Sequence, residues 1–233
     1  MCGMDDHPIT RRGSLLKLGG LAAGALGAGV FLGDDAGAGD GPNAVAAGLV
    51  SCVLSPELTQ GPFATEGDKL RRDIRAGRPG VLLTLRTTVL DVSTCKPIQG
   101  AAVDIWHCDA GGTYSGFAQE GTAGRTFLRG IQKTDASGLA VFKTIYPGWY
   151  SGRAVHIHVR VYLGGNVVHT GQLFFPEAIT DAVYRRAPYR GRGSRDTRNA
   201  TDSIFRNGGS RSTLKLTKAT TGYVGRITMG VHR

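Results

Sequence analysis

The chain has 233 residues, of which 41% are hydrophobic, and a formal net charge of +10. This composition supports a packed core and excludes wholesale disorder. Its 36 glycines follow no Gly-X-Y period, which excludes a collagen-like chain, and four cysteines without a CxxC pair are too few for a disulfide-dense scaffold.

The N-terminal residues are typical of an export signal. Arg11 and Arg12 precede an uncharged stretch, 18–33, that is rich in Gly, Ala and Leu. This stretch is too short and too rich in glycine for a membrane span, whereas a basic region followed by apolar and small residues is typical of a signal peptide. The paired arginines resemble a twin-arginine signal, although Ser14 stands where that signal usually has a bulky apolar residue; the alternative is an amphipathic or disordered leader.

We therefore expect residues 1–46 to be a twin-arginine signal peptide with a linker, and residues 47–233 to be one domain. The mature protein would be extracellular or in the cell envelope, with no stable membrane span. Its net charge would be +12, because residues 1–46 hold three basic and five acidic residues. An exported protein rarely has DNA as its partner, so we do not expect it to bind nucleic acid.

Beyond the linker, strand signals dominate from residue 81. Runs rich in Val, Leu, Ile and Thr, separated by Gly, Pro and Asn turns, predict strands. They cover residues 81–92, 101–107, 139–145, 153–163, 167–175, 214–216 and 223–231. Residues 176–186 predict one short helix, and residues 108–130 and 187–212 predict long loops. This spacing indicates an all-β fold, an antiparallel sandwich or barrel, in which the first two strands form a hairpin.

Three cysteines remain after the signal, which predicts one disulfide and one buried thiol. Cys95 and Cys108 lie near opposite ends of the expected hairpin, so they are poor partners. Cys52 is then expected to pair with one of them, and Cys95 is the preferred candidate.

Six arginines gather in the second long loop, which gives two interpretations: a solvated loop or a rim that attracts anions. They are Arg185, Arg186, Arg190, Arg192, Arg195 and Arg198.

The strand at 153–163 carries the clearest chemical signal. Side chains alternate across a strand, so Val155, Ile157 and Val159 share a core face while His156 and His158 share the other. Two imidazoles at this spacing lie about 7 Å apart at Cα, which suits one metal ion.

Two tyrosines follow turns that could aim them at this strand. Tyr150 follows Pro147-Gly148, and Tyr114 follows a Gly-Gly pair. Either alone is more often a packing residue. Together with imidazole, however, phenolate oxygen suits a hard ion such as Fe(III).

These segments together resemble the intradiol ring-cleavage dioxygenases, which include catechol 1,2-dioxygenase and protocatechuate 3,4-dioxygenase. The motifs are 106–114, 147–150 and 153–158, within a resemblance that runs from about Thr59 to Tyr189. The export signal makes the chain most similar to the secreted branch of that family. The resemblance implies a catalytic β-sandwich in residues 47–233.

The resemblance also implies a site. Its Fe(III) ligands would be Tyr114, Tyr150, His156 and His158. The substrates would be a catechol and O2, and the ring would open between its hydroxyl-bearing carbons to a cis,cis-muconate.

Three further residues have roles implied by their positions. Arg153 and Gln172 match the active-site arginine and glutamine of the family, and Tyr150 would help to accept a substrate proton. Arg153 would stabilise charge on the substrate ring. Trp149 is a candidate wall for the substrate ring or else a packing residue.

Two other interpretations stay open. The chain could be a non-catalytic exported β-sandwich that binds aromatic or polysaccharide surfaces, or an enzyme that uses another metal at the histidine pair. The sequence leaves the particular catechol and the oligomeric state undetermined.

Overall fold

The computed structural model describes residues 52–67 and 69–233. The expected signal peptide and linker, residues 1–46, lie outside the described residues. Within these ranges, no helix has the length and apolar character needed to span a membrane.

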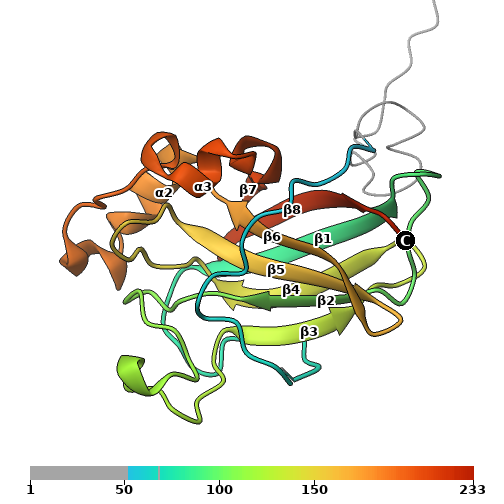
Figure 1. Ribbon diagram of the computed structural model, residues 1–233. Coiled ribbons are helices and arrows are strands. Elements are labelled where there is room, and N and C mark those ends of the chain that lie inside the picture. The colour runs from blue at the N-terminus through green and yellow to red at the C-terminus, as the bar shows by residue number, and fades with distance from the viewer. Residues whose placement is uncertain (1–51, 68) are drawn as a thin grey trace, which may run out of the picture. The chain divides into compact units, whose positions relative to one another are not determined.

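The described chain forms two four-stranded sheets that pack face to face (Figure 1). The first sheet has the order β4-β1-β8-β7 and the second β3-β2-β5-β6. The strands are β1 Leu82–Asp91, β2 Ala102–Trp106, β3 Arg129–Lys133, β4 Leu139–Ile145, β5 His156–Leu163, β6 Asn166–Phe174, β7 Lys215–Ala219 and β8 Gly222–Val231. Five of the six neighbouring pairs are antiparallel, and β1 and β8 are parallel. The predicted all-β sandwich is confirmed.

The core lies between the sheets and is built by strand alternation. Leu83 and Leu85 of β1 face inward from one sheet, and Val103, Ile157 and Val159 face inward from the other, all at most 1% exposed. Since β5 places its valines and its isoleucine on this face, His156 and His158 lie on the outer face of the second sheet.

Helices gather at one end of the sheets (Figure 1). The predicted short helix is α2, Glu177–Tyr184, and it follows β6 directly. The predicted polar loop after it contains more structure than expected. It holds the short helix α3, Ser203–Arg206, and the 3₁₀ helices η2 Tyr189–Arg192, η3 Asn199–Thr201 and η4 Gly209–Ser212; η1, Ala118–Glu120, lies in the earlier loop.

Two expectations about the strands are wrong. The first two strands do not form a hairpin, since β1 pairs with β4 and β8 while β2 pairs with β3 and β5. Residues 92–101 therefore cross from one sheet to the other, which lets both apolar faces meet in the core. The short strand β3 begins inside a predicted loop, because its five residues include Ile131 as the one large apolar side chain and give no alternating pattern.

The segment before β1 covers the outer face of the second sheet (Figure 1). Leu58 N–H donates to Thr170 O at 2.9 Å on β6, and Ile131 N–H of β3 donates to Lys69 O at 2.9 Å. A Cys52–Cys95 disulfide, with a Cα–Cα distance of 5.6 Å, links the start of this segment to the turn after β1, and Cys108 is a buried free thiol. This cover explains how histidines on the outer face of a sheet become buried.

Candidate active site

Tyr114 is delivered by a tight turn that follows β2. The Asp109 carboxylate accepts hydrogen bonds from the backbone N–H groups of Gly111 at 2.8 Å and Thr113 at 3.1 Å. An aspartate that bonds to the backbone ahead of it closes a turn without help from a sheet. The next side chain, Tyr114, therefore enters the interior, where it is 1% exposed.

The turn that carries Tyr150 packs directly against the first. Gly148 N–H donates to Asp109 O at 3.0 Å. A Cβ on Gly148 would lie 2.5 Å from Asp109 O and 2.6 Å from Ala110 O, so only glycine allows the two backbones to come this close. Their contact places the Tyr114 and Tyr150 ring centroids 5.6 Å apart.

The two histidines of β5 are buried at 2% and 0% exposure. The ring of His158 stacks on Trp106 of β2, with 5.0 Å between centroids and 2° between planes. On the covering segment, Gly61 lies so close that a Cβ there would be 3.0 Å from His158 Cε1. His156 Nδ1 lies 2.6 Å from Ala154 O. A carbonyl oxygen only accepts, so Nδ1 carries the proton and Nε2 presents its lone pair.

The four predicted ligand residues come together at one point. His156 Nε2 lies 3.1 Å from both His158 Nε2 and the Tyr150 hydroxyl. The Tyr114 ring centroid is 6.0 Å from that of His158, and its buried hydroxyl makes no hydrogen bond of normal geometry among the described residues. His156 Nε2 has one lone pair and cannot accept fully from both neighbours, and a cation that binds the lone pairs of both imidazoles would resolve this.

Burial sets the protonation of this cluster. It lowers the pKa of His156 to about 3 and that of His158 well below its usual value, so both rings are neutral and able to bind a metal. Burial also raises the pKa of Tyr150 to about 12 and that of Tyr114 well above its usual value. A bound cation would therefore have to displace the phenol protons, as cations do with coordinating groups.

Arg153 and Gln172 lie beside the cluster and contact each other. Arg153 Nη2 donates to Gln172 Oε1, and Gln172 Nε2 donates to Thr59 O at 2.8 Å. Gln172 is opposite His158 in the β5–β6 register. The pair thus joins the strand that carries the histidines to the covering segment.

Asp202 fixes Arg153 and is a residue that the sequence did not indicate. Its Oδ2 accepts from Arg153 Nε at 3.0 Å and from Ala154 N–H at 2.8 Å, and its side chain is 1% exposed. Burial alone would raise its pKa, but the Ala154 N–H and the Arg153 charge outweigh burial and lower the pKa. An aspartate before Ser203 has the signature of a helix N-cap, yet nothing in the sequence pairs it with Arg153.

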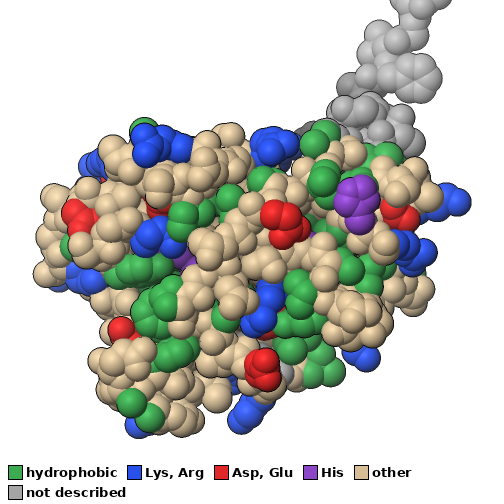
Figure 2. All heavy atoms as spheres, viewed as in Figure 1, with side chains coloured by type: hydrophobic (Ala, Val, Ile, Leu, Met, Phe, Trp, Pro, Cys, Tyr) green, Lys and Arg blue, Asp and Glu red, His purple; other side chains and the backbone are tan. Residues whose placement is uncertain are grey.

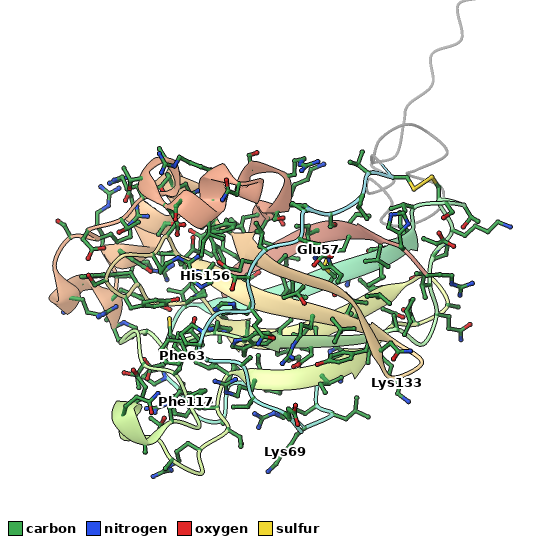
Figure 3. All side chains as sticks on the ribbon, viewed as in Figure 1. Glu57, Phe63, Lys69, Phe117, Lys133 and His156 are labelled. Atoms are coloured by element: carbon green, nitrogen blue, oxygen red, sulfur yellow. A yellow bond between two sulfur atoms is a disulfide. The ribbon has the colours of Figure 1, made fainter. Side chains whose placement is uncertain are left out.

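Phe63 is a second neighbour that the sequence did not indicate. Its ring stacks on Tyr114 with centroids 4.1 Å apart, and Figure 3 shows it beside Phe117 on the side of the molecule where His156 lies. Trp149, the candidate substrate wall, has its ring under the Arg192 guanidinium at 4.7 Å and packs on the core. These contacts are those of a packing residue, and a role for Trp149 in substrate binding stays a prediction.

Comparison with known proteins identifies the family. The family model described as "Dioxygenase" matches residues 53–183, which is more than half of the chain and includes all four converging residues. The chain belongs to the intradiol ring-cleavage dioxygenase family.

Chlorocatechol 1,2-dioxygenase of Rhodococcus opacus is 30% identical over 141 residues, 50% of this chain and 54% of that protein. Catechol 1,2-dioxygenase 1 of Acinetobacter lwoffii is 34% identical over 101 residues, 41% of this chain and 32% of that protein. The matches thus span about half of the length of the Rhodococcus protein and about a third of the length of the Acinetobacter protein.

Solved structures of this dioxygenase family superpose over most of the chain. An intradiol ring-cleavage dioxygenase from Tetranychus urticae is 36% identical with a TM-score of 0.74, over 78% of this chain and 95% of that one. The dioxygenase domain of a carbohydrate-binding fusion protein from Streptomyces sp. SirexAA-E is 29% identical with a TM-score of 0.62, over 77% of this chain and 99% of that domain.

The donor set of this family member fits a hard, high-valent metal. The residues that the structure describes contain no group of three or more His, Cys, Asp or Glu side chains placed to bind a metal. A metal at this site would depend on the tyrosines, and two phenolate oxygens with two imidazole nitrogens suit Fe(III) better than Cu(I) or structural zinc.

Proposed function

We propose that this protein is an Fe(III)-dependent intradiol dioxygenase that opens catechol-type rings between their hydroxyl-bearing carbons. Catechol and O2 would combine, with both oxygen atoms retained, to give a cis,cis-muconate-type product. The observation that carries the proposal is the convergence of Tyr114, Tyr150, His156 and His158 at one buried point.

The chain itself supplies ligands, proton acceptors and charge. Held by the four side chains, Fe(III) would supply a Lewis acid for both catechol oxygens and so make the ring reactive toward O2. Tyr150 is the more exposed of the two tyrosines, so its oxygen would be the better placed to take a proton from the substrate. Tyr114, which is buried under Phe63, would remain as a fixed ligand.

Arg153 and Gln172 would act on the substrate side of the site. The Arg153 guanidinium is 17% exposed and held by Asp202, so it presents a fixed positive charge where negative charge develops on the ring. Gln172 joins it to Thr59 and would keep it oriented.

We also propose that the protein works outside the cytoplasm. The paired arginines and the apolar stretch after them support export, and the Cys52–Cys95 disulfide is of a kind that persists in oxidising compartments. Lys and Arg side chains are scattered over the face that Figure 2 shows, which gives no support for a nucleic-acid surface there.

Oxygen uptake by the iron-loaded protein across a panel of catechols, with the product mass determined, tests the proposal. We expect uptake of one O2 per catechol, a product heavier than the substrate by two oxygen atoms, and a red-brown colour from tyrosinate-to-iron charge transfer. A colourless iron-replete protein would contradict the ligand set. Binding of aromatic compounds or polysaccharides without oxygen uptake would favour the non-catalytic alternative, and activity with a metal other than iron would favour the other enzyme.

A further inference from the structure

The backbone from Trp149 to Ala154, which carries Tyr150 and Arg153, is held by side chains of one later segment, residues 192–202. Arg192 Nη1 donates to Trp149 O at 2.5 Å. Asp196 accepts from Ser151 Oγ at 2.6 Å and from Gly152 N–H at 3.2 Å. Asp202 accepts hydrogen bonds from Arg153 Nε and from Ala154 N–H. The site-bearing turn is thus fixed along its length by residues about 45 positions later in the chain.

Arg192 differs from Asp196 and Asp202 because it contacts both of the turns that carry Tyr114 and Tyr150. Besides Trp149 O, its Nη1 lies 3.5 Å from Ala110 O, which belongs to the turn before Tyr114. Its guanidinium covers the Trp149 ring at 4.7 Å. At Gly112, a Cβ would lie 2.9 Å from Arg192 Nη2 and 2.4 Å from Trp149 O, so this glycine leaves room for the guanidinium between the turns.

The neighbouring arginines anchor the segment that carries Arg192. Arg195 pairs with Glu177 at 2.7 Å and Asp181 at 2.5 Å, and Arg198 pairs with the same two carboxylates at 2.9 and 3.2 Å. Both acids lie on α2, which follows β6 directly. Arg185 Nε also donates to Asp181 O at 3.3 Å, so four of the six arginines in the basic run make specific contacts, which departs from both the solvated loop and the anion-attracting rim considered from sequence.

We propose that Arg192 is a positioning residue that sets the separation of Tyr114 and Tyr150. The inference rests on the proposed function, in which both tyrosines bind iron. A guanidinium can donate to two carbonyls at once and still lie flat on an indole ring, whereas an ammonium cannot. Without Arg192, both turns keep their own internal hydrogen bonds and the Gly148 N–H to Asp109 O bond between them, but they lose the side chain that bridges Ala110 O and Trp149 O.

The test compares Arg192→Ala and Arg192→Lys with Arg190→Ala. Arg190 lies on the same 3₁₀ helix with an exposed side chain, so it matches the loss of charge without the loss of the contacts. Each purified protein is loaded with Fe(III). Its tyrosinate charge-transfer band is recorded, its Fe(III) affinity is measured by competition with a chelator, and its fold is checked by circular dichroism.

We expect Arg192→Ala to shift the charge-transfer band and to weaken Fe(III) binding by roughly 10- to 100-fold, as changes next to metal ligands do. Arg192→Lys should lie between Arg192→Ala and the wild type, and Arg190→Ala should match the wild type. An unchanged band and affinity in Arg192→Ala would overturn the inference while leaving the proposed function intact. If Arg192→Ala does not fold, an Arg192→Lys protein indistinguishable from the wild type would overturn it. A wild type without any charge-transfer band would overturn the proposed function, and the inference with it.

Discussion

Asp202 accepts hydrogen bonds from Arg153 Nε at 3.0 Å with one carboxylate oxygen and from the N–H groups of Ile204 and Phe205 at 2.7 and 3.2 Å with the other. One buried carboxylate therefore both caps α3 and fixes the arginine beside the candidate metal ligands. The orientation of Arg153 depends on the fold of a segment 49 residues away.

Replacing Asp202 should reduce activity through Arg153. In Asp202→Asn the cap and the volume are largely kept, but Arg153 loses its charge partner and can turn away. We expect kcat for the best catechol to fall by roughly 10- to 100-fold, the range seen when groups that orient a site are changed. Steady-state oxygen uptake measures it. Asp135→Asn is a matched control, because Asp135 closes the turn before β4 with similar bonds to Ser137 and Leu139. Equal kcat values for the two variants would contradict the role of Asp202.

Tyr150→Phe tests the metal assignment. The change removes one phenol oxygen but keeps the ring that packs edge-on against Tyr114 and His156. We expect the charge-transfer spectrum of the iron-loaded protein to change and turnover to be strongly impaired, since both a ligand and a proton acceptor are lost. Full activity with the wild-type spectrum would remove Tyr150 from the ligand set.

The sequence predicts the local parts of this site well. Alternation along residues 153–163 places His156 and His158 on one face of a strand, and glycines before Tyr114 and Tyr150 mark both turns. These signals are readable because side-chain direction within a strand or a turn depends on neighbouring residues alone.

The strand pairings and the side-chain contacts between distant segments could not be predicted. Alternation tells which face of β1 and β2 is apolar, but it does not tell which strand each pairs with, and the expected hairpin was wrong for that reason. In the same way, an acidic residue such as Asp202 or a basic residue such as Arg192 has no sequence feature that sets it apart from other loop residues, and only the fold brings it to the site. A sequence pattern reports local geometry, whereas these contacts come from tertiary packing.

Gly148→Ala should weaken the contact between the two tyrosine-bearing turns. The added Cβ would meet Asp109 O at 2.5 Å, so the backbones must separate. Such overpacking usually costs about 1–3 kcal/mol of stability, and here it should also shift the charge-transfer band of the iron-loaded protein. Thermal unfolding and the spectrum are measured together. Gly191→Ala is the control, since a Cβ there meets nothing within 4 Å. A Gly148→Ala protein as stable as Gly191→Ala would show that the turns can separate freely.

The metal-free protein should lose stability as the pH falls from about 6.5 to 4, and His107 is one cause. This ring is fully buried, with Nε2 2.7 Å from Thr144 Oγ1 and Nδ1 2.8 Å from Cys108 O, and burial lowers its pKa to about 4. Below pH 6.5 this histidine is protonated in the unfolded chain but stays neutral in the folded chain, so acid favours unfolding. His107 adds up to roughly 1.4 kcal/mol per pH unit to the pH dependence of the free energy of unfolding until the pH reaches its folded pKa.

Urea unfolding of the wild type and of His107→Gln at several pH values measures this pH dependence. The variant should have a shallower slope between pH 6.5 and 4, although its stability at pH 7 is lower. Parallel slopes for the two proteins would show that His107 titrates normally in the folded state.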